Sequence, residues 1–183
     1  MDAKAKIFII SGEAGSGKTR LITKLVSGIK QNGIKITGII SPARFEHGKK
    51  TGIFAEDIYS QERMLLAYYQ PGWDPENPKR EWKMDPEVLK WGESILLNST
   101  PTRVLIIDEL GYLEFEKDTG WTKAFDILEE GLYEVAIIAV RESLLPLAVQ
   151  RWKTAKVIHL EEPSQIIAQA ADLEAQILAT VNK

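Results

Sequence analysis

The run Ile7-Phe8-Ile9-Ile10-Ser11 leads directly into Gly12-Glu13-Ala14-Gly15-Ser16-Gly17-Lys18-Thr19, so an apolar stretch of strand length precedes the pattern G-x-x-x-x-G-K-T. Three glycines within six positions allow the backbone to curl until successive N–H groups point at phosphate oxygens. The lysine adds a compact positive charge for the β- and γ-phosphates, and the threonine offers a hydroxyl to Mg²⁺. The stretch therefore predicts a strand, a phosphate-binding loop and a helix start that together bind a nucleoside triphosphate.

The predicted nucleotide-binding residues are eight consecutive positions: Gly12, Glu13, Ala14, Gly15, Ser16, Gly17, Lys18 and Thr19. Lys18 is also a predicted catalytic residue, and Thr19 a predicted metal ligand. A glycine-rich turn with no ligand is the alternative. The context favours the functional interpretation, because apolar residues recur at helical spacing after Thr19 until Asn32-Gly33, and the start of a helix favours an anion.

Bulk properties restrict the class of protein. The 183 residues suit one α/β domain, which we predict to span residues 1–183. No apolar run has the length of a membrane span, and the amino terminus shows no signal-peptide pattern, so we expect a cytoplasmic protein without membrane contact. The absence of cysteine excludes disulfides and thiolate zinc sites, and a net charge of −3 gives no footprint for nucleic acid.

The remainder of the chain alternates apolar strands with amphipathic helices. The predicted strands are 34–41, 104–109, 134–140 and 156–160, and the predicted helices are 85–98, 121–131, 144–152 and a last one from Ser164. Such continuous apolar strands predict a mainly parallel central sheet with helices on both faces, in three layers. The ligand of such a sheet lies beyond the carboxyl ends of its strands, where residues 12–19 fall.

One segment departs from this alternation. Gly48-Lys49-Lys50 separates short runs, with 51–58 and 62–68 following, which predicts a small β-hairpin or meander near the nucleotide. Residues 70–83 contain three prolines and two tryptophans, and we expect an extended loop there.

A pair of carboxylates supplies the second half of the predicted site. Asp108 follows four apolar residues, Val104-Leu105-Ile106-Ile107, which is the pattern of a Walker B strand that brings a carboxylate close to Mg²⁺. Glu109 comes next and is placed to orient or deprotonate a water molecule at the γ-phosphate. Glu114 and Glu116 are acidic alternatives without this positional argument. The pair favours hydrolysis, with Mg²⁺ held largely through the nucleotide.

Phosphoryl transfer also needs positive charge from outside the loop. Arg141, directly after an apolar strand, is the predicted source, while Arg44, Lys49 and Lys50 in the hairpin are either phosphate contacts or a solvated basic turn. No guanine signature is present. The aromatic residues around the long loop either stack on the base or anchor the loop to the core: Tyr68, Tyr69, Trp73, Trp82 and Trp91.

These motifs together resemble the THEP1-type nucleoside-triphosphatases, a family of P-loop NTPases. Residues 12–19 are similar to the family's G-E-x-G-x-G-K-T, and residues 106–114 to its I-I-D-E-I-G-x-M-E. Residues 41–44 and 48–53 resemble its arginine-bearing turn and G-x-R-x-G-F, with Lys50 in place of arginine and Ile53 in place of phenylalanine. The resemblance implies hydrolysis of ATP, GTP and other triphosphates with low base selectivity, Asp108 on Mg²⁺ and Glu109 as the water-activating residue.

Two other functions remain open at this point. A phosphotransferase would use the long aromatic loop and basic hairpin to close over an acceptor such as a nucleoside, nucleotide or small metabolite. A nucleotide-dependent switch would instead expose Trp73, Trp82 and Trp91 as a docking surface for a partner.

Overall fold

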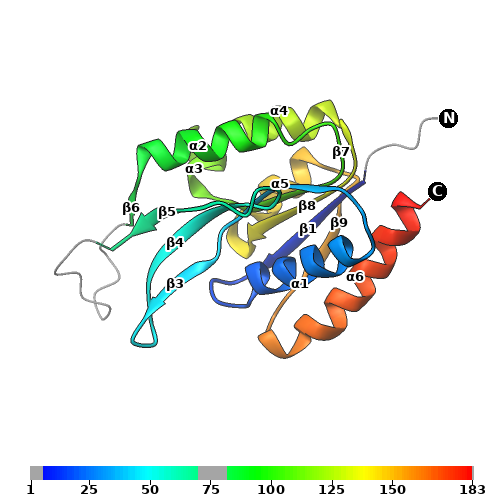
Figure 1. Ribbon diagram of the computed structural model, residues 1–183, viewed down its shortest axis with the longest axis horizontal. Helices are drawn as coiled ribbons and strands as arrows, with labels where there is room; N and C mark the ends of the chain where they lie inside the picture. The colour runs from blue at the N-terminus through cyan, green and yellow to red at the C-terminus, as the bar shows by residue number, and fades with distance from the viewer. Residues whose placement is uncertain (1–5, 70–81, 183) are drawn as a thin grey trace.

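The computed structural model describes residues 6–69 and 82–182, and within them the strands form a single nine-stranded sheet (Figure 1). Eight strands follow the spatial order β6-β5-β4-β2-β7-β8-β1-β9, and β3 pairs with β4 off this path. Their bounds are β1 Lys6–Gly12, β2 Ile36–Ile40, β3 Ala43–Glu46, β4 Lys49–Asp57, β5 Arg63–Tyr68, β6 Lys83–Met84, β7 Thr102–Leu110, β8 Tyr133–Arg141 and β9 Lys156–His159.

The half of the sheet that carries the predicted site is parallel. β1 pairs in parallel with both β8 and β9, and β7 pairs in parallel with β8 and β2. β1, β2, β7, β8 and β9 therefore end at the same edge, so residues distant in sequence meet there. The register places Gly12 beside Arg141.

The predicted hairpin exists, but it continues the main sheet. β3 and β4 pair antiparallel around the turn at His47-Gly48, and β4 also pairs antiparallel with β2 and β5. The antiparallel strands thus extend the parallel half. The sequence predicted a small hairpin insertion because backbone pairing between β2 and β4 leaves no local signal.

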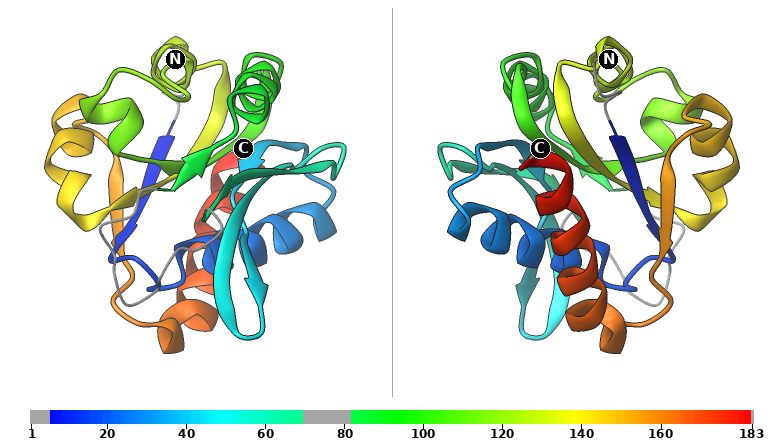
Figure 2. Two further views of the ribbon diagram at one scale, coloured as in Figure 1. Left: turned by 90° about the vertical axis from the view of Figure 1, so that its left-hand side faces the viewer. Right: turned by 90° about the vertical axis from the view of Figure 1, so that its right-hand side faces the viewer.

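The helices cover both faces of the sheet, which confirms the three-layer α/β prediction (Figure 2). α1 (Lys18–Gln31) and α6 (Ile166–Val181) bury their apolar stripes on one face, together with Phe8 and Ile10 of β1. α2 (Pro86–Leu97), α4 (Lys123–Glu130) and α5 (Leu145–Arg151) cover the other face, where Ile9 points. Alternate residues of a strand point to opposite faces, which explains the fully apolar strands.

Local sequence sets several helix boundaries. Asp85 caps α2, because its carboxylate accepts hydrogen bonds from the backbone N–H of Glu87 (2.9 Å) and of Val88 (3.3 Å). α4 begins at Lys123, two residues later than predicted, and a short helix that was not predicted, α3 (Tyr112–Glu116), precedes it. Most of the predicted extended loop, residues 70–81, lies outside the described residues, while Lys83 begins β6. No helix in the described parts of the chain is long and apolar enough to cross a bilayer.

Candidate active site

The phosphate loop, residues 12–19, connects β1 to the first turn of α1. Gly15 and Gly17 have φ angles of +86° and +103°, which side-chain-bearing residues rarely adopt. A Cβ on Gly17 would also lie 2.7 Å from the Cδ1 atom of Ile166. The loop is closed by a hydrogen bond of 3.2 Å from the Ser16 N–H to the Glu13 carbonyl. Backbone conformation therefore favours glycine at both positions, and packing does so at Gly17 as well.

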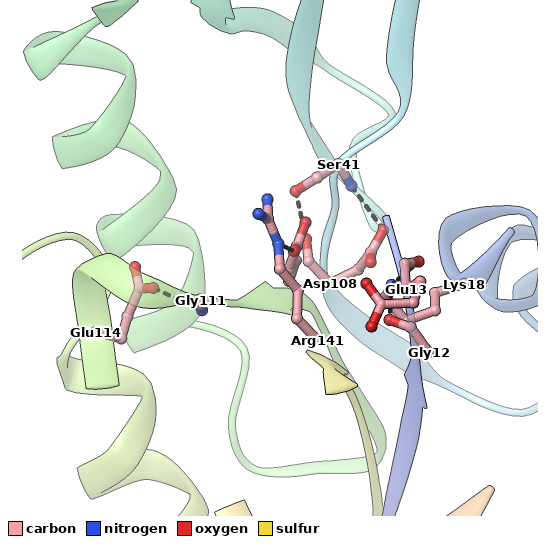
Figure 3. A network of polar contacts seen from close by, with 9 residues as sticks. Gly12, Glu13, Lys18, Ser41, Asp108, Gly111, Glu114 and Arg141 are labelled. Atoms are coloured by element: carbon pink, nitrogen blue, oxygen red, sulfur yellow. Dashed lines mark hydrogen bonds and ion pairs between the residues drawn. The ribbon is translucent and has the colours of Figure 1, made fainter. Parts of the chain in front are cut away.

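Lys18 folds back onto the loop (Figure 3). Its ammonium donates hydrogen bonds to the carbonyl oxygens of Gly12 (2.7 Å) and Glu13 (2.9 Å), and the residue is buried. Burial lowers the pKa of Lys18, and the nearby carboxylates of Glu109 and Asp108 oppose this effect. The lysine thus places a positive charge at the loop that backbone oxygens hold without neutralising it.

Asp108 lies at the carboxyl edge of the sheet and is 1% exposed. Its Oδ2 atom accepts a hydrogen bond of 3.1 Å from the Ser41 N–H, and the Ser41 hydroxyl donates to the Asp108 carbonyl (Figure 3). The Oδ1 atom has no hydrogen-bond partner in the described parts of the chain. Burial raises the pKa of Asp108 to about 6, although hydrogen bonding from Ser41 and Thr19 lowers it in part. A buried carboxylate with one bare oxygen has the chemistry of a cation ligand.

Glu109 is an extra residue in the pairing of β7 with β8, because Asp108 pairs with Ala139 and Leu110 with the next residue, Val140. Such bulges redirect side chains at functional sites. The Glu109 Oε1 atom accepts a hydrogen bond of 2.6 Å from Nε of Arg141, and both side chains are partly exposed. The sequence predicted Arg141 as a source of positive charge and gave no partner for it. The structure pairs it with the predicted catalytic glutamate, beside the start of the phosphate loop.

A loop with a buried lysine, a buried carboxylate with one unpartnered oxygen and a second carboxylate paired with arginine therefore lie at one sheet edge. The model of a protein family described as NTPase matches residues 7–178. The chain belongs to the NTPase family. This confirms the prediction of a P-loop nucleoside-triphosphatase fold and enzyme class from the sequence motifs.

Individual relatives of this NTPase agree with the family match. The nucleoside-triphosphatase THEP1 of Caldivirga maquilingensis is 26% identical over 128 residues, which cover 70% of this chain and 72% of that protein. The protein of the same name from Ignicoccus hospitalis is 32% identical over 108 residues, covering 58% and 60%.

Two solved structures share the fold. The solution structure of a human cancer-related nucleoside triphosphatase has a TM-score of 0.70 at 19% identity and covers 96% of this chain and 99% of its own. The crystal structure of THEP1 from the hyperthermophile Aquifex aeolicus has a TM-score of 0.62 at 16% identity, with coverage of 93% and 98%. At these identities the likeness concerns the fold alone.

The acidic alternatives to Glu109 lie elsewhere in this NTPase. Glu114 is buried and accepts hydrogen bonds of 2.9 Å from the N–H groups of Gly111 and Trp121. Figure 3 shows it pointing away from Asp108 and Lys18. Burial raises the pKa of Glu114, opposed by these two hydrogen bonds. Glu116 is exposed at the end of α3. Glu114 therefore stabilises the chain behind the site.

The aromatic and basic residues that the sequence placed near the base or the phosphates lie in several environments. Arg44 pairs with Glu46 on the surface of the hairpin. Trp82 stacks on Tyr69 with ring centroids 3.7 Å apart, and the ammonium of Lys50 lies 5.2 Å from the Trp82 ring centroid. Trp91 packs against the core on the α2 face. Trp73 lies outside the described residues.

Residues present at this site fit a magnesium ion held mainly by a nucleotide. Within residues 6–69 and 82–182 no group of three or more His, Cys, Asp or Glu residues could hold a metal ion by itself. Asp108 offers one unpaired oxygen and Thr19 a nearby hydroxyl. Mg²⁺ commonly takes few protein ligands and completes its shell with phosphate oxygens and water. Ser41, which orients Asp108, had no predicted role, and its only signal was its place after the neighbouring buried strand.

Proposed function

We propose that the protein hydrolyses the terminal phosphate of nucleoside triphosphates in a Mg²⁺-dependent reaction with low selectivity for the base. The observation that carries the proposal is the meeting of Lys18, Asp108 and Glu109 at one edge of the sheet, in a chain of the NTPase family. We also propose that residues 1–183 act as one domain. A cytoplasmic location stays a prediction.

Nucleotide binding falls to the phosphate loop. The N–H groups of residues 12–19 would donate to phosphate oxygens, and the Lys18 ammonium would exchange its bonds to the Gly12 and Glu13 carbonyls for bonds to the β- and γ-phosphates. Thr19 and Asp108 would hold Mg²⁺, which neutralises charge on the β- and γ-phosphate oxygens when bound. Ser41 keeps the Asp108 carboxylate oriented for this role.

Catalysis falls to Glu109 and Arg141. Glu109 would accept a proton from the attacking water molecule. As this happens, the water oxygen forms a bond to the γ-phosphorus, and the bond between the γ-phosphorus and the diphosphate breaks. Arg141 uses only its Nε in the pair with Glu109, as far as the described residues show, so its terminal nitrogens could stabilise charge on the transferred phosphoryl group. The low base selectivity rests on the family resemblance and on the lack of a guanine signature in the sequence.

The variant Glu109→Gln tests the proposal, because it keeps the shape of the side chain and removes the base. We expect phosphate release to fall by about 10²- to 10⁴-fold while the dissociation constant for MgATP changes by less than about threefold. Glu116→Gln is the matched control and should hydrolyse at the parent rate.

The same assay distinguishes the alternatives. Hydrolysis by Glu109→Gln at the parent rate would refute the assignment of the base. Labelled ATP incubated with a panel of nucleosides and metabolites tests transfer, and a labelled organic product formed faster than free phosphate would replace hydrolysis as the function. A screen of all common nucleoside triphosphates measures base selectivity.

A further inference from the structure

The β3–β4 hairpin, residues 43–57, extends past the edge of the sheet on the side of the phosphate loop (Figure 1). Its first strand begins two residues after Ser41, whose N–H holds the Asp108 carboxylate. The hairpin is also fixed to the sheet, since β4 pairs with both β2 and β5. The pairing with β2 and β5 covers residues 52–57, and the part of β4 nearer the turn pairs with β3, where Lys50 is opposite Phe45.

Lys50 lies on β4, two residues after the turn at His47-Gly48. The charges that act on its ammonium are those of the candidate active site, in the order Glu109, Arg141, Asp108 and Lys18. Although Lys50 is exposed to solvent, surrounding protein partly desolvates its ammonium and lowers the pKa of Lys50, and Glu109 opposes this most strongly. The ammonium thus interacts electrostatically with the charges that the proposed function places at the γ-phosphate.

The present partner of Lys50 is an aromatic ring. Its ammonium lies 5.2 Å from the centroid of the Trp82 ring, and no described carboxylate is within ion-pair distance. Cation–π contacts at partly exposed sites are weak beside a contact between an ammonium and a phosphate. Lys18 and Arg141, in contrast, already have two carbonyl oxygens and a carboxylate as partners. Lys50 is therefore the site's cation that is most available to an added negative charge.

We propose that Lys50 binds the terminal phosphate from the hairpin and so makes the site prefer triphosphates to diphosphates. This inference rests on the proposed function, because it assumes that the phosphate loop binds the nucleotide. It adds a specificity-determining residue outside the loop and the two carboxylates. A diphosphate would contact the loop but present no group to Lys50.

The test compares two ligands, the β,γ-imido analogue of ATP and ADP, each titrated calorimetrically with Mg²⁺. We expect Lys50→Ala to weaken binding of the triphosphate analogue by roughly 10- to 100-fold, the range for a lost hydrogen bond to a charged group, and binding of ADP by less than about threefold. Lys50→Arg keeps the charge and should recover most of the loss. Circular dichroism checks that each variant is folded.

Lys49→Ala is the matched control. Lys49 precedes Lys50 on β4, is opposite Glu46, and points to the other face of the strand pair. It should bind both ligands like the parent. An equal loss for both ligands in Lys50→Ala, or no loss, would overturn the inference while leaving the proposed function intact. A parent protein that binds neither ligand would refute both.

Discussion

Replacing Asp108 with asparagine should make the metal-free, nucleotide-free protein increasingly stable relative to the parent as the pH rises, and should abolish hydrolysis. Burial raises the pKa of Asp108 to about 6, whereas an aspartate in an unfolded chain has a pKa of about 3.9. The folded state therefore favours the protonated carboxyl. At a pH below both pKa values, Asp108 is protonated in the folded and the unfolded state, so its titration does not change the free energy of unfolding. As the pH rises between them, the unfolded chain releases its proton first, so stability falls.

The size of this effect follows from the two pKa values. A difference of about two corresponds to about 3 kcal/mol, and about 2 kcal/mol of it develops between pH 4 and pH 7.5. Asparagine does not titrate and keeps an oxygen for the Ser41 N–H. Its added N–H₂ replaces the unpartnered Oδ1 atom, which changes stability by an amount independent of pH.

Urea unfolding in EDTA at pH 4, 5.5 and 7.5 measures the free energy of unfolding of both proteins. The stability of Asp108→Asn relative to the parent should increase by about 2 kcal/mol from the lowest to the highest pH. Asp118→Asn, at an exposed aspartate, is the control for the same chemical change outside the site. If the free energies of unfolding of Asp108→Asn and the parent differ by the same amount at all three pH values, the reasoning is refuted.

Two further substitutions test the architecture that supports the site. Gly38→Ala should cost more than about 3 kcal/mol in urea unfolding, because Gly38 has a φ of +117° and its Cβ would lie 1.9 Å from the Ile106 carbonyl; Gly48→Ala, with open space around it, should cost about 1 kcal/mol. Glu114→Ala leaves two backbone N–H groups without their acceptor, so we expect a loss of about 2–4 kcal/mol and slower phosphate release. An unfolding curve like that of the parent for Gly38→Ala or for Glu114→Ala would contradict the contacts assigned to that residue.

Local signals in the sequence predicted much of the fold. The loop glycines, the Asp85-Pro86 helix start and the apolar strand before Asp108 each carry their own chemistry, and the structure places an element at each. α3 was missed because five residues are too few for a helical period, and its fold depends on the buried Glu114 carboxylate. Short helices held by tertiary contacts leave no such signal.

Short stretches of sequence could not predict which side chains of the site contact one another, because these contacts depend on the order of the strands in the sheet. Arg141 meets Glu109 because β7 and β8 are neighbours and a bulge turns Glu109, and Ser41 meets Asp108 because β2 lies next to β7. Both facts follow from strand order, which alternating strands and helices do not determine. The sequence could therefore name the charged residues but not their partners.

These partners explain how Lys18, Lys50 and Asp108 coexist at the site without forming ion pairs with one another. Lys18 is held by backbone carbonyls, Lys50 by an aromatic ring, and the buried Asp108 by a backbone N–H. Direct pairing of Lys18 with Asp108 would satisfy both groups and stabilise the fold, but a triphosphate and Mg²⁺ would then have to break that pair before binding. The raised pKa of Asp108 reflects mainly the cost of burying this carboxylate without an ion-pair partner. Stability lost at functional groups in this way is commonly recovered when they are replaced, with loss of function. The two changes expected in Asp108→Asn, a stability relative to the parent that increases with pH and a loss of hydrolysis, are therefore two consequences of one arrangement.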